Sequence, residues 1–184
     1  MSAKTHIPVR EKEASPYANS EDFGRIFLED MNGLYHLSFL LTGDQEKAEK
    51  CFVSGVEDSV SENHVFKEWA RSWAKRTIVQ NAIRELRPHR SHSGSYLSPS
   101  VPSNNPQSNG PEHFEVAAVL ALGDFERFVF VMSVLEHYSQ HECALLLGCS
   151  ISDVRAARVR ALEELATTHH AISFTPANSH ALCG

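Results

Sequence analysis

Two consecutive helix signatures near the C-terminus constrain the fold of this sequence more than any other feature. In the stretch SQHECALLLGCSISDVRAARVRALEEL, Ser139 and Glu142 form a capping-box pair that predicts a helix start. Gly148 predicts the end of that helix, because glycine enters the left-handed conformation at little cost. Ser150 and Asp153 repeat the capping pattern before a second, basic helix. The pattern indicates a helix-turn-helix that places its second helix in a DNA groove, and the alternative is an ordinary helical hairpin.

The composition is that of a globular protein. The chain has 184 residues, of which 42% are hydrophobic and 22% charged, enough for one domain or two small ones. No apolar run approaches the roughly 20 residues of a membrane helix, and the N-terminus has no apolar signal-peptide core, so we expect a cytoplasmic protein without membrane contact. The cysteines form no CxxC pair, which predicts reduced thiols; they are Cys51, Cys143, Cys149 and Cys183.

Apolar residues recur at helical spacing along most of the chain, so we expect an all-α fold. Strand signals are weak throughout. The buried side of a first helix is predicted to carry Phe23, Ile26, Phe27, Met31, Leu34, Leu37 and Leu41. Gly43 and Asp44 interrupt this pattern, a second helix passes through Ala48 and Val56, and a third runs from about Asn63 to Leu86.

Composition also predicts two helical units. Residues 1–19 form a mobile polar tail, and residues 20–87 form the first unit. Residues 88–112 are rich in Ser, Pro, Asn and Gly and cannot bury a core, so we expect a flexible linker. Residues 113–168 form the second unit, which the helix-turn-helix closes, and residues 169–184 form a loose tail.

Positive charge is concentrated in one part of this acidic chain. The formal net charge is −6, but seven basic residues and two acidic ones lie between Lys67 and Arg90. Local potential decides contact with a nucleic acid more than net charge does. A solvated basic helix face is the alternative interpretation.

The arrangement resembles the extracytoplasmic-function sigma factors of bacterial RNA polymerase. Residues 122–165 resemble sigma region four, FLLTGDQEKAE at 39–49 resembles the entry to region two, and EWARSWAKRTIVQNAIREL at 68–86 resembles the region-two helix that meets the promoter. The region-four positions are Arg127, Tyr138, Ser139, Glu142, Ala144, Val154, Arg155, Arg160 and Ala161. The resemblance implies a transcription initiation factor whose partners are promoter DNA, core RNA polymerase and an anti-sigma factor.

The resemblance and the charge pattern together give candidate DNA contacts. Basic side chains would meet phosphates, Asn81 could read a base edge, and the serines would lie at a helix N-terminus that favours a phosphate. The candidates are Arg71, Lys75, Arg76, Asn81, Arg84, Ser150, Ser152, Arg155 and Arg160. Trp69 and Trp73 lie four residues apart, where the resemblance implies base stacking, although burial of both in the core is the favoured interpretation.

A candidate polymerase contact lies around Glu46, Glu49 and Val53. Residues 50–54 depart from the family, which carries an acidic residue and an apolar–glutamine pair there. An alternative function is therefore a degenerate sigma-like regulator that does not bind core polymerase. In the second helix of the helix-turn-helix, Ala156 and Ala157 offer no hydrogen bond to a base edge, which predicts weak sequence discrimination.

Catalysis is not indicated. The sequence has no phosphate-binding glycine loop and no nucleophile elbow, so we expect neither an enzyme nor a cofactor. His137 and His141 have a spacing that zinc ligands use, but a third ligand and the glutamate of an HExxH pattern are missing, so no metal site is predicted.

Overall fold

The computed structural model describes residues 15–61, 64–88 and 111–173, with side chains placed for all but 111–114 and 169–173. These residues confirm the all-α prediction. The helices are α1 (Ser20–Glu29), α2 (Met31–Thr42), α3 (Gln45–Ser61), the 3₁₀ turn η1 (Lys67–Trp69), α4 (Ala70–Leu86), α5 (Pro111–Ala121), α6 (Asp124–Phe130), the π-helical turn η2 (Val131–Leu135), α7 (Gln140–Leu147) and α8 (Ile151–Ser173). In the part of the chain that the structure describes, no helix combines the length and apolarity that crossing a membrane requires.

The first predicted helix is two helices in the structure. The chain turns at Asp30, whose φ and ψ of −115° and 27° are not helical, and α2 starts immediately after it. The Asp30 carboxylate lies against Gly33 in space that a Cβ would need, so this glycine permits the turn. As a result Met31, which was predicted to be buried, is 49% exposed.

The chain is ordered before α1, within the predicted N-terminal tail. The amide of Ala18 donates to the carbonyl of Val65 at 2.7 Å, and the amide of Lys67 donates to the carbonyl of Pro16 at 3.0 Å. The tail prediction is therefore wrong for residues 15–19, and its remainder lies outside the described residues, as does most of the predicted linker. The prediction that the chain leaves its last helix near residue 168 is also wrong, because α8 continues to Ser173.

Helices α3 and α4 are fixed against each other by a close approach at Gly55. A Cβ on Gly55 would lie 2.8 Å from Cγ1 of Ile78, so only glycine permits this spacing. The buried Thr77 hydroxyl donates to the carbonyls of Gly55 and Ala74 at 3.2 and 2.8 Å and lies 3.0 Å from the Ser59 hydroxyl. Satisfied buried hydroxyls tolerate little sliding, so they set the register of the two helices.

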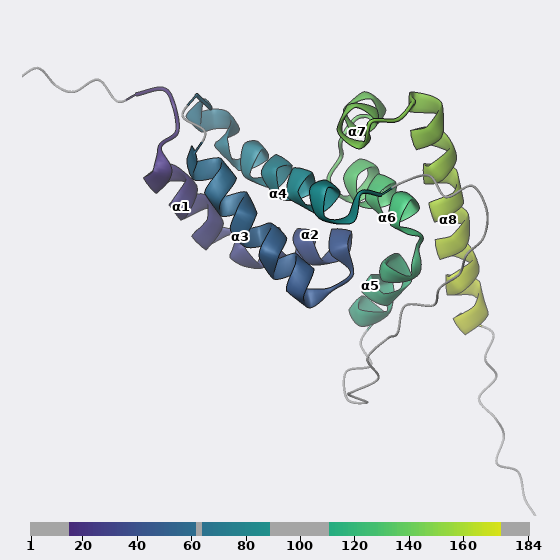
Figure 1. Cartoon of the computed structure of the whole chain (residues 1–184). Helices are drawn as coiled ribbons and strands as arrows, with labels where there is room; N and C mark the ends of the chain where they lie inside the picture. Colours follow the sequence, from purple (N-terminus) through teal and green to yellow (C-terminus); the bar gives the residue numbers. More distant parts are fainter. Residues whose placement is uncertain (1–14, 62–63, 89–110, 174–184) are drawn as a thin grey trace, which may run out of the picture.

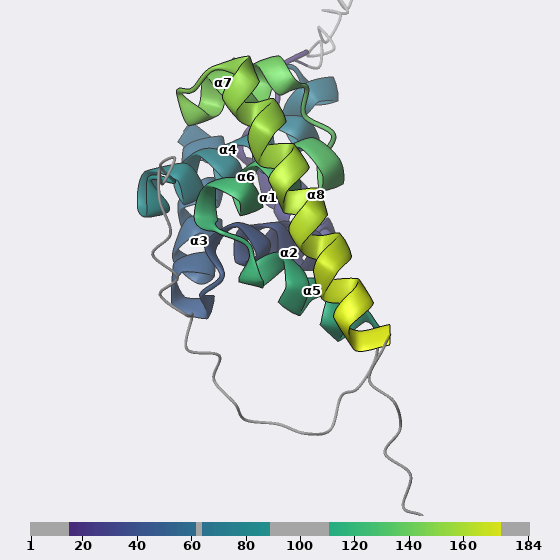
Figure 2. The ribbon, with the colours of Figure 1, turned by 90° about the vertical axis from the view of Figure 1, so that its right-hand side faces the viewer.

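The N-terminal helices α1–α4 and the C-terminal helices α5–α8 form two groups that lie side by side (Figure 1). They share one apolar core, in which α2 contacts α5, α6 and η2. Leu37 and Leu41 of α2 and Phe125 and Phe128 of α6 are buried members of this core. In the C-terminal group α8 crosses the other helices, with α7 at its start and α5 beside its later turns (Figure 2).

Candidate nucleic-acid interface

The predicted helix-turn-helix is present with both of its caps. The Ser139 side chain accepts from the amide of Glu142 at 3.2 Å, and the Glu142 carboxylate accepts from the amide of Ser139 at 2.8 Å. Gly148 ends α7 in the left-handed conformation, with φ of 64°. Ser150 and Asp153 make the same reciprocal bonds at the start of α8, both at 3.2 Å. The residues that determine the turn between α7 and α8 therefore lie close to it in the sequence.

Helix α8 packs one side on the core and leaves the other open. Val154, Ala157 and Ala161 are fully buried. The opposite side exposes Ser152, Arg155, Ala156, Val159 and Leu162. This exposed side carries the predicted upstream contacts, together with the apolar side chains of Val159 and Leu162.

The predicted DNA contacts of the C-terminal group have intramolecular partners. The Nε of Arg155 donates to the side-chain oxygen of Gln140 at 2.7 Å, which ties α8 to α7. The guanidinium of Arg160 binds the Glu126 carboxylate at 2.7 and 3.0 Å. Ser150 and Ser152 lie 2.7 Å apart at the start of α8. Arg155 and Arg160 are both exposed, so solvent and phosphates can reach them.

The basic side chains of α4 also face carboxylates. Arg71 binds Glu29 at 3.2 Å, Arg84 binds Asp58 at 2.9 Å, and Lys75 binds Glu136 at 2.7 Å. Arg76 is half-buried and lies near Tyr138 and Glu142. The pairs of Arg71 and Arg84 are exposed, and exposed pairs contribute about 0–1 kcal/mol, so a phosphate can replace the carboxylate in them.

Asn81 does not fit the predicted base-reading role. Its side chain is buried, and its Nδ2 donates to Asp58 at 3.0 Å and to the carbonyl of Thr77 at 2.9 Å. Its Oδ1 accepts from Arg84 at 3.1 Å. Both polar atoms of the amide are therefore used inside the protein, where they join α3 to α4.

Burial of both tryptophans in the core was the favoured interpretation, and it is wrong for Trp69. Its side chain is 60% exposed and meets the Phe66 ring edge-on, with centroids 5.4 Å apart. Phe66 stacks in turn on Tyr17, with centroids 4.8 Å apart. Trp73 packs against the core, but its indole Nε1 is buried and has no hydrogen-bond partner among the described residues. An exposed aromatic beside basic residues suits stacking on nucleic-acid bases.

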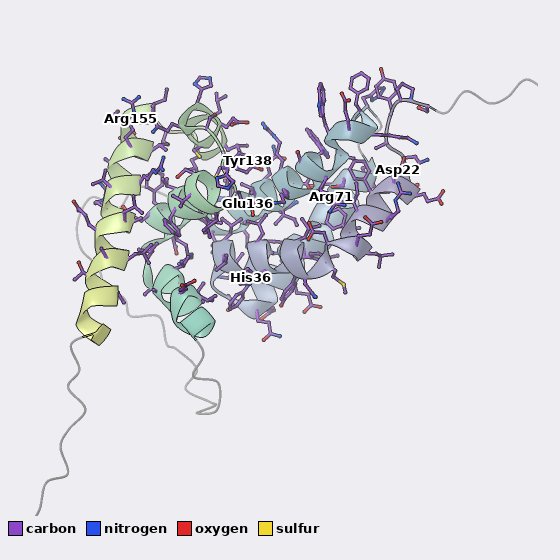
Figure 3. All side chains as sticks on the ribbon, turned by 180° about the vertical axis from the view of Figure 1, so that it is seen from behind. Asp22, His36, Arg71, Glu136, Tyr138 and Arg155 are labelled. Carbon is purple, nitrogen blue, oxygen red and sulfur yellow. The ribbon has the colours of Figure 1, made fainter. Side chains whose placement is uncertain are left out.

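A groove of about 630 Å³ separates η1 and α4 from the segment between η2 and α7. Trp69, Trp73, Arg71, Lys75, Arg76 and Tyr138 contribute to its walls. Glu136 and Tyr138 lie where the two helix groups meet, whereas Arg155 is distant at the start of α8 (Figure 3). Burial raises the pKa of Tyr138 to about 12, so its hydroxyl remains protonated.

The candidate polymerase contacts lie on one side of α3. Glu46, Glu49 and Val53 are all exposed at helical spacing, and Val53 is 48% exposed. Among the residues that depart from the family, Cys51 faces the core, where burial raises the pKa of its thiol to about 11. Lys50 binds Glu85 at 2.6 Å, so its charge is directed toward α4. The outer side of α3 therefore carries Glu46 and Glu49 together with the exposed Val53 and Val60.

Two residues at the contact between the helix groups have no local sequence signal for that role. Arg127, expected only as a motif position, is buried and donates from Nε to the carbonyl of Leu41 in α2 at 3.3 Å. Glu136, the partner of Lys75, fits no motif. Within the described residues, no group of three or more His, Cys, Asp or Glu side chains could hold a metal ion.

Comparison with known proteins gives a family match for the C-terminal helices. Residues 117–165 match the family "Sigma-70, region 4". No curated protein matches the sequence. Among solved structures, the sigma factor RpoE in complex with the anti-sigma factor NepR from Bartonella quintana has 16% identity and a TM-score of 0.49, covering 82% of this chain and 98% of that one. The helix-turn-helix thus lies within a segment that matches sigma-70 region 4, as the resemblance of residues 122–165 predicted.

Proposed function

We propose that this chain is an extracytoplasmic-function sigma factor, which directs core RNA polymerase to promoters. One observation carries the proposal: the segment that matches sigma-70 region 4 contains a completely capped helix-turn-helix whose second helix has an open side. This geometry is the one that docks a helix in the major groove. The function requires no catalytic residues, and the chain acts in the cytoplasm, where transcription takes place.

The two helix groups contact different parts of the promoter. Ser150 and Ser152 bind a phosphate at the N-terminus of α8, and Arg155 and Arg160 contact the upstream element. In the N-terminal group, Trp69 stacks on an unpaired base, because it is the exposed member of its aromatic cluster. The phosphates of the same DNA region are bound by Arg71, Lys75, Arg76 and Arg84.

Core polymerase binds the outer side of α3 through Glu46, Glu49 and Val53. An acidic surface with an exposed apolar residue fits a basic partner surface with an apolar contact point. An anti-sigma factor is the third proposed partner, as the resemblance to the family implies.

Co-purification with core RNA polymerase tests the assignment. Tagged full-length protein should retain the core enzyme, and Glu49→Lys should weaken that retention because it reverses a charge in the proposed contact. Glu115→Lys is the matched control, since Glu115 is an exposed glutamate on a different helix, α5. If the wild-type protein retains no polymerase, the degenerate sigma-like regulator becomes the better assignment.

DNA titrations of the full chain test the assigned contacts. Arg155→Ala should weaken binding to promoter duplex by roughly 1–3 kcal/mol if Arg155 makes a bidentate base contact, with little effect on scrambled duplex. Arg84→Ala should weaken binding to both duplexes equally and flatten the salt dependence, because a phosphate contact carries no sequence information. Equal effects of the two variants on both duplexes would contradict the assignment.

A further inference from the structure

Four aromatic rings gather at the surface around the start of α4. The Trp69 and Phe66 rings meet edge-on, with centroids 5.4 Å apart. Phe66 and Tyr17 are closer to parallel, with centroids 4.8 Å apart and 30° between their planes, and His64 meets Tyr17 edge-on at 6.2 Å. Tyr17 and Phe66 remain 38% and 37% exposed. Large apolar side chains that gather at a surface in this way mark a binding site rather than a core.

The backbone holds Tyr17 opposite Phe66. The two residues form an antiparallel bridge, which places the segment before α1 beside the start of α4 (Figure 1). Two hydrogen bonds join residues 16–18 to residues 65–67 on either side of this bridge, the arrangement that brings two opposite side chains closest together. Ala18 is buried and anchors the segment in the core. The Tyr17 ring is therefore in position before a ligand arrives, which lowers the entropic cost of binding one.

The row of rings begins at the basic side of α4. Trp69 lines the groove whose walls carry the basic α4 side chains. Lys67, the residue after Phe66, has a side chain that is 45% exposed, and its ammonium group binds the Asp22 carboxylate at 3.3 Å. Asp22 and Arg71 lie at the same end of the molecule (Figure 3). A single strand of DNA whose phosphates follow α4 can therefore place one base on Trp69 and a neighbouring base further along the row.

We propose that Tyr17 and Phe66 form a second base-stacking position, next to Trp69, for the single-stranded DNA of an open promoter. The inference rests on the proposed function, because it continues from the unpaired base assigned to Trp69. The segment before α1, which the sequence predicted to be a tail, is then part of the nucleic-acid interface. Stacking on an aromatic face needs no hydrogen bond to a base edge, so this position accepts any base. It requires the ring of Tyr17 but not its hydroxyl.

The expected contribution of Tyr17 follows from the packing of its ring. Phe66 lies against one face of this ring, so at most one face is available to a base. Removing the ring should therefore weaken binding of single-stranded DNA by roughly fivefold, the lower end of what a stacking aromatic contributes per base.

The first experiment titrates the full-length protein against a labelled single-stranded oligo-dT by fluorescence anisotropy. Tyr17→Ala and Tyr17→Leu should both weaken binding by the factor given above, and Tyr17→Phe should bind like wild type. Leucine restores apolar packing against Phe66 but offers no aromatic face. Wild-type affinity in Tyr17→Leu would therefore overturn the proposal, because the side chain would then act only by holding the segment in place.

The matched control is Tyr35→Ala. Tyr35 is a half-buried tyrosine on α2 that meets Phe52 edge-on, outside this row of rings. Its replacement removes a ring of the same size from the same helix group, and binding of oligo-dT should not change. A loss equal to that of Tyr17→Ala would overturn the proposal, since general loosening of the N-terminal helices would then explain both.

The second experiment locates the bases by photocrosslinking. On irradiation, 5-iododeoxyuridine placed in the oligonucleotide joins to an aromatic ring on which it stacks, with loss of hydrogen iodide. Mass spectrometry of the digested complex should find separate crosslinked peptides that contain Tyr17 and Trp69. Tyr17→Ala should lose the first crosslink and keep the second.

The two experiments separate this inference from the function on which it rests. Retention of core polymerase, with crosslinks at Trp69 but none at Tyr17 or Phe66, would reject the inference and leave the sigma-factor assignment intact. A protein that binds neither polymerase nor single-stranded DNA would reject both.

Discussion

Replacing Arg127 tests the energetic role of the buried guanidinium. Its side chain is 7% exposed and donates to the carbonyls of Leu41 and Leu122 at 3.3 and 3.2 Å and to Asp124 at 2.7 Å. Arg127→Met keeps much of the side-chain volume but leaves both carbonyls without this donor. Asp124 is 56% exposed, so its carboxylate returns to water at little cost.

The magnitude follows from these contacts. An unsatisfied buried acceptor costs about 1–3 kcal/mol, and the apolar methionine recovers part of the cost of burying a charge. We therefore expect Arg127→Met to reduce the free energy of unfolding by about 2–4 kcal/mol. The free energy of unfolding of Arg127→Lys should lie between those of Arg127→Met and wild type, since lysine keeps the charge but not the planar guanidinium.

Urea denaturation followed by circular dichroism measures this loss. Arg25→Met is the matched control, because Arg25 also pairs with an aspartate three residues away but is 66% exposed. The control should lose at most about 1 kcal/mol. A loss in Arg127→Met no larger than in the control would refute the argument that the buried carbonyls depend on this side chain.

Three further predictions concern the corner that leads into the helix-turn-helix. Ser139→Ala removes the oxygen that accepts from the Glu142 amide, and thermal unfolding should show a loss of about 1 kcal/mol; no loss would mean that water replaces the cap. His137→Gly should stabilise the protein by up to about 1 kcal/mol in the same assay, because its φ is 58°, and destabilisation would show that the imidazole contributes more than the strain costs. Hydrogen bonds from the Ser139 hydroxyl and amide lower the pKa of Glu142. A carboxyl whose pKa is lower in the folded state contributes stability above its unfolded pKa, and this stability is lost as the pH falls through the folded pKa. Glu142→Gln should therefore weaken the pH dependence of the free energy of unfolding at acid pH. An unchanged pH dependence at acid pH would contradict this origin.

Local signals predicted the helix-turn-helix and failed for contacts between distant segments. The caps at Ser139 and Ser150 depend on residues three positions away, and the turn at Gly148 depends on one residue, so the sequence contains the complete determinant of each. By contrast, Lys75 and Glu136 are 61 residues apart, and Arg127 and Leu41 are 86 residues apart. No periodicity relates such pairs, because they meet only after the helices have packed.

The sequence pattern also did not predict which individual residues are buried. Asn81, among basic residues, was predicted to read a base edge, which needs an exposed side chain, but the approach of α3 to α4 buries it. Trp69 was expected to be buried because it is large and apolar, yet it precedes α4 in a short 3₁₀ turn that directs it outward. In both cases the tertiary position, rather than the residue type, decides the exposure.

The close packing at Gly55 has a mechanical consequence for any partner of α3. The hydroxyls of Ser59 and Thr77, and Asn81 with Asp58, connect α3 to α4 at two successive turns of α4. We therefore expect the outward side of α3 and the basic side of α4 to move as one rigid body. A protein that binds α3 therefore also sets the position and angle at which α4 meets its own ligand. The spacing between these two binding surfaces depends on Gly55, because a Cβ there would push the helices apart.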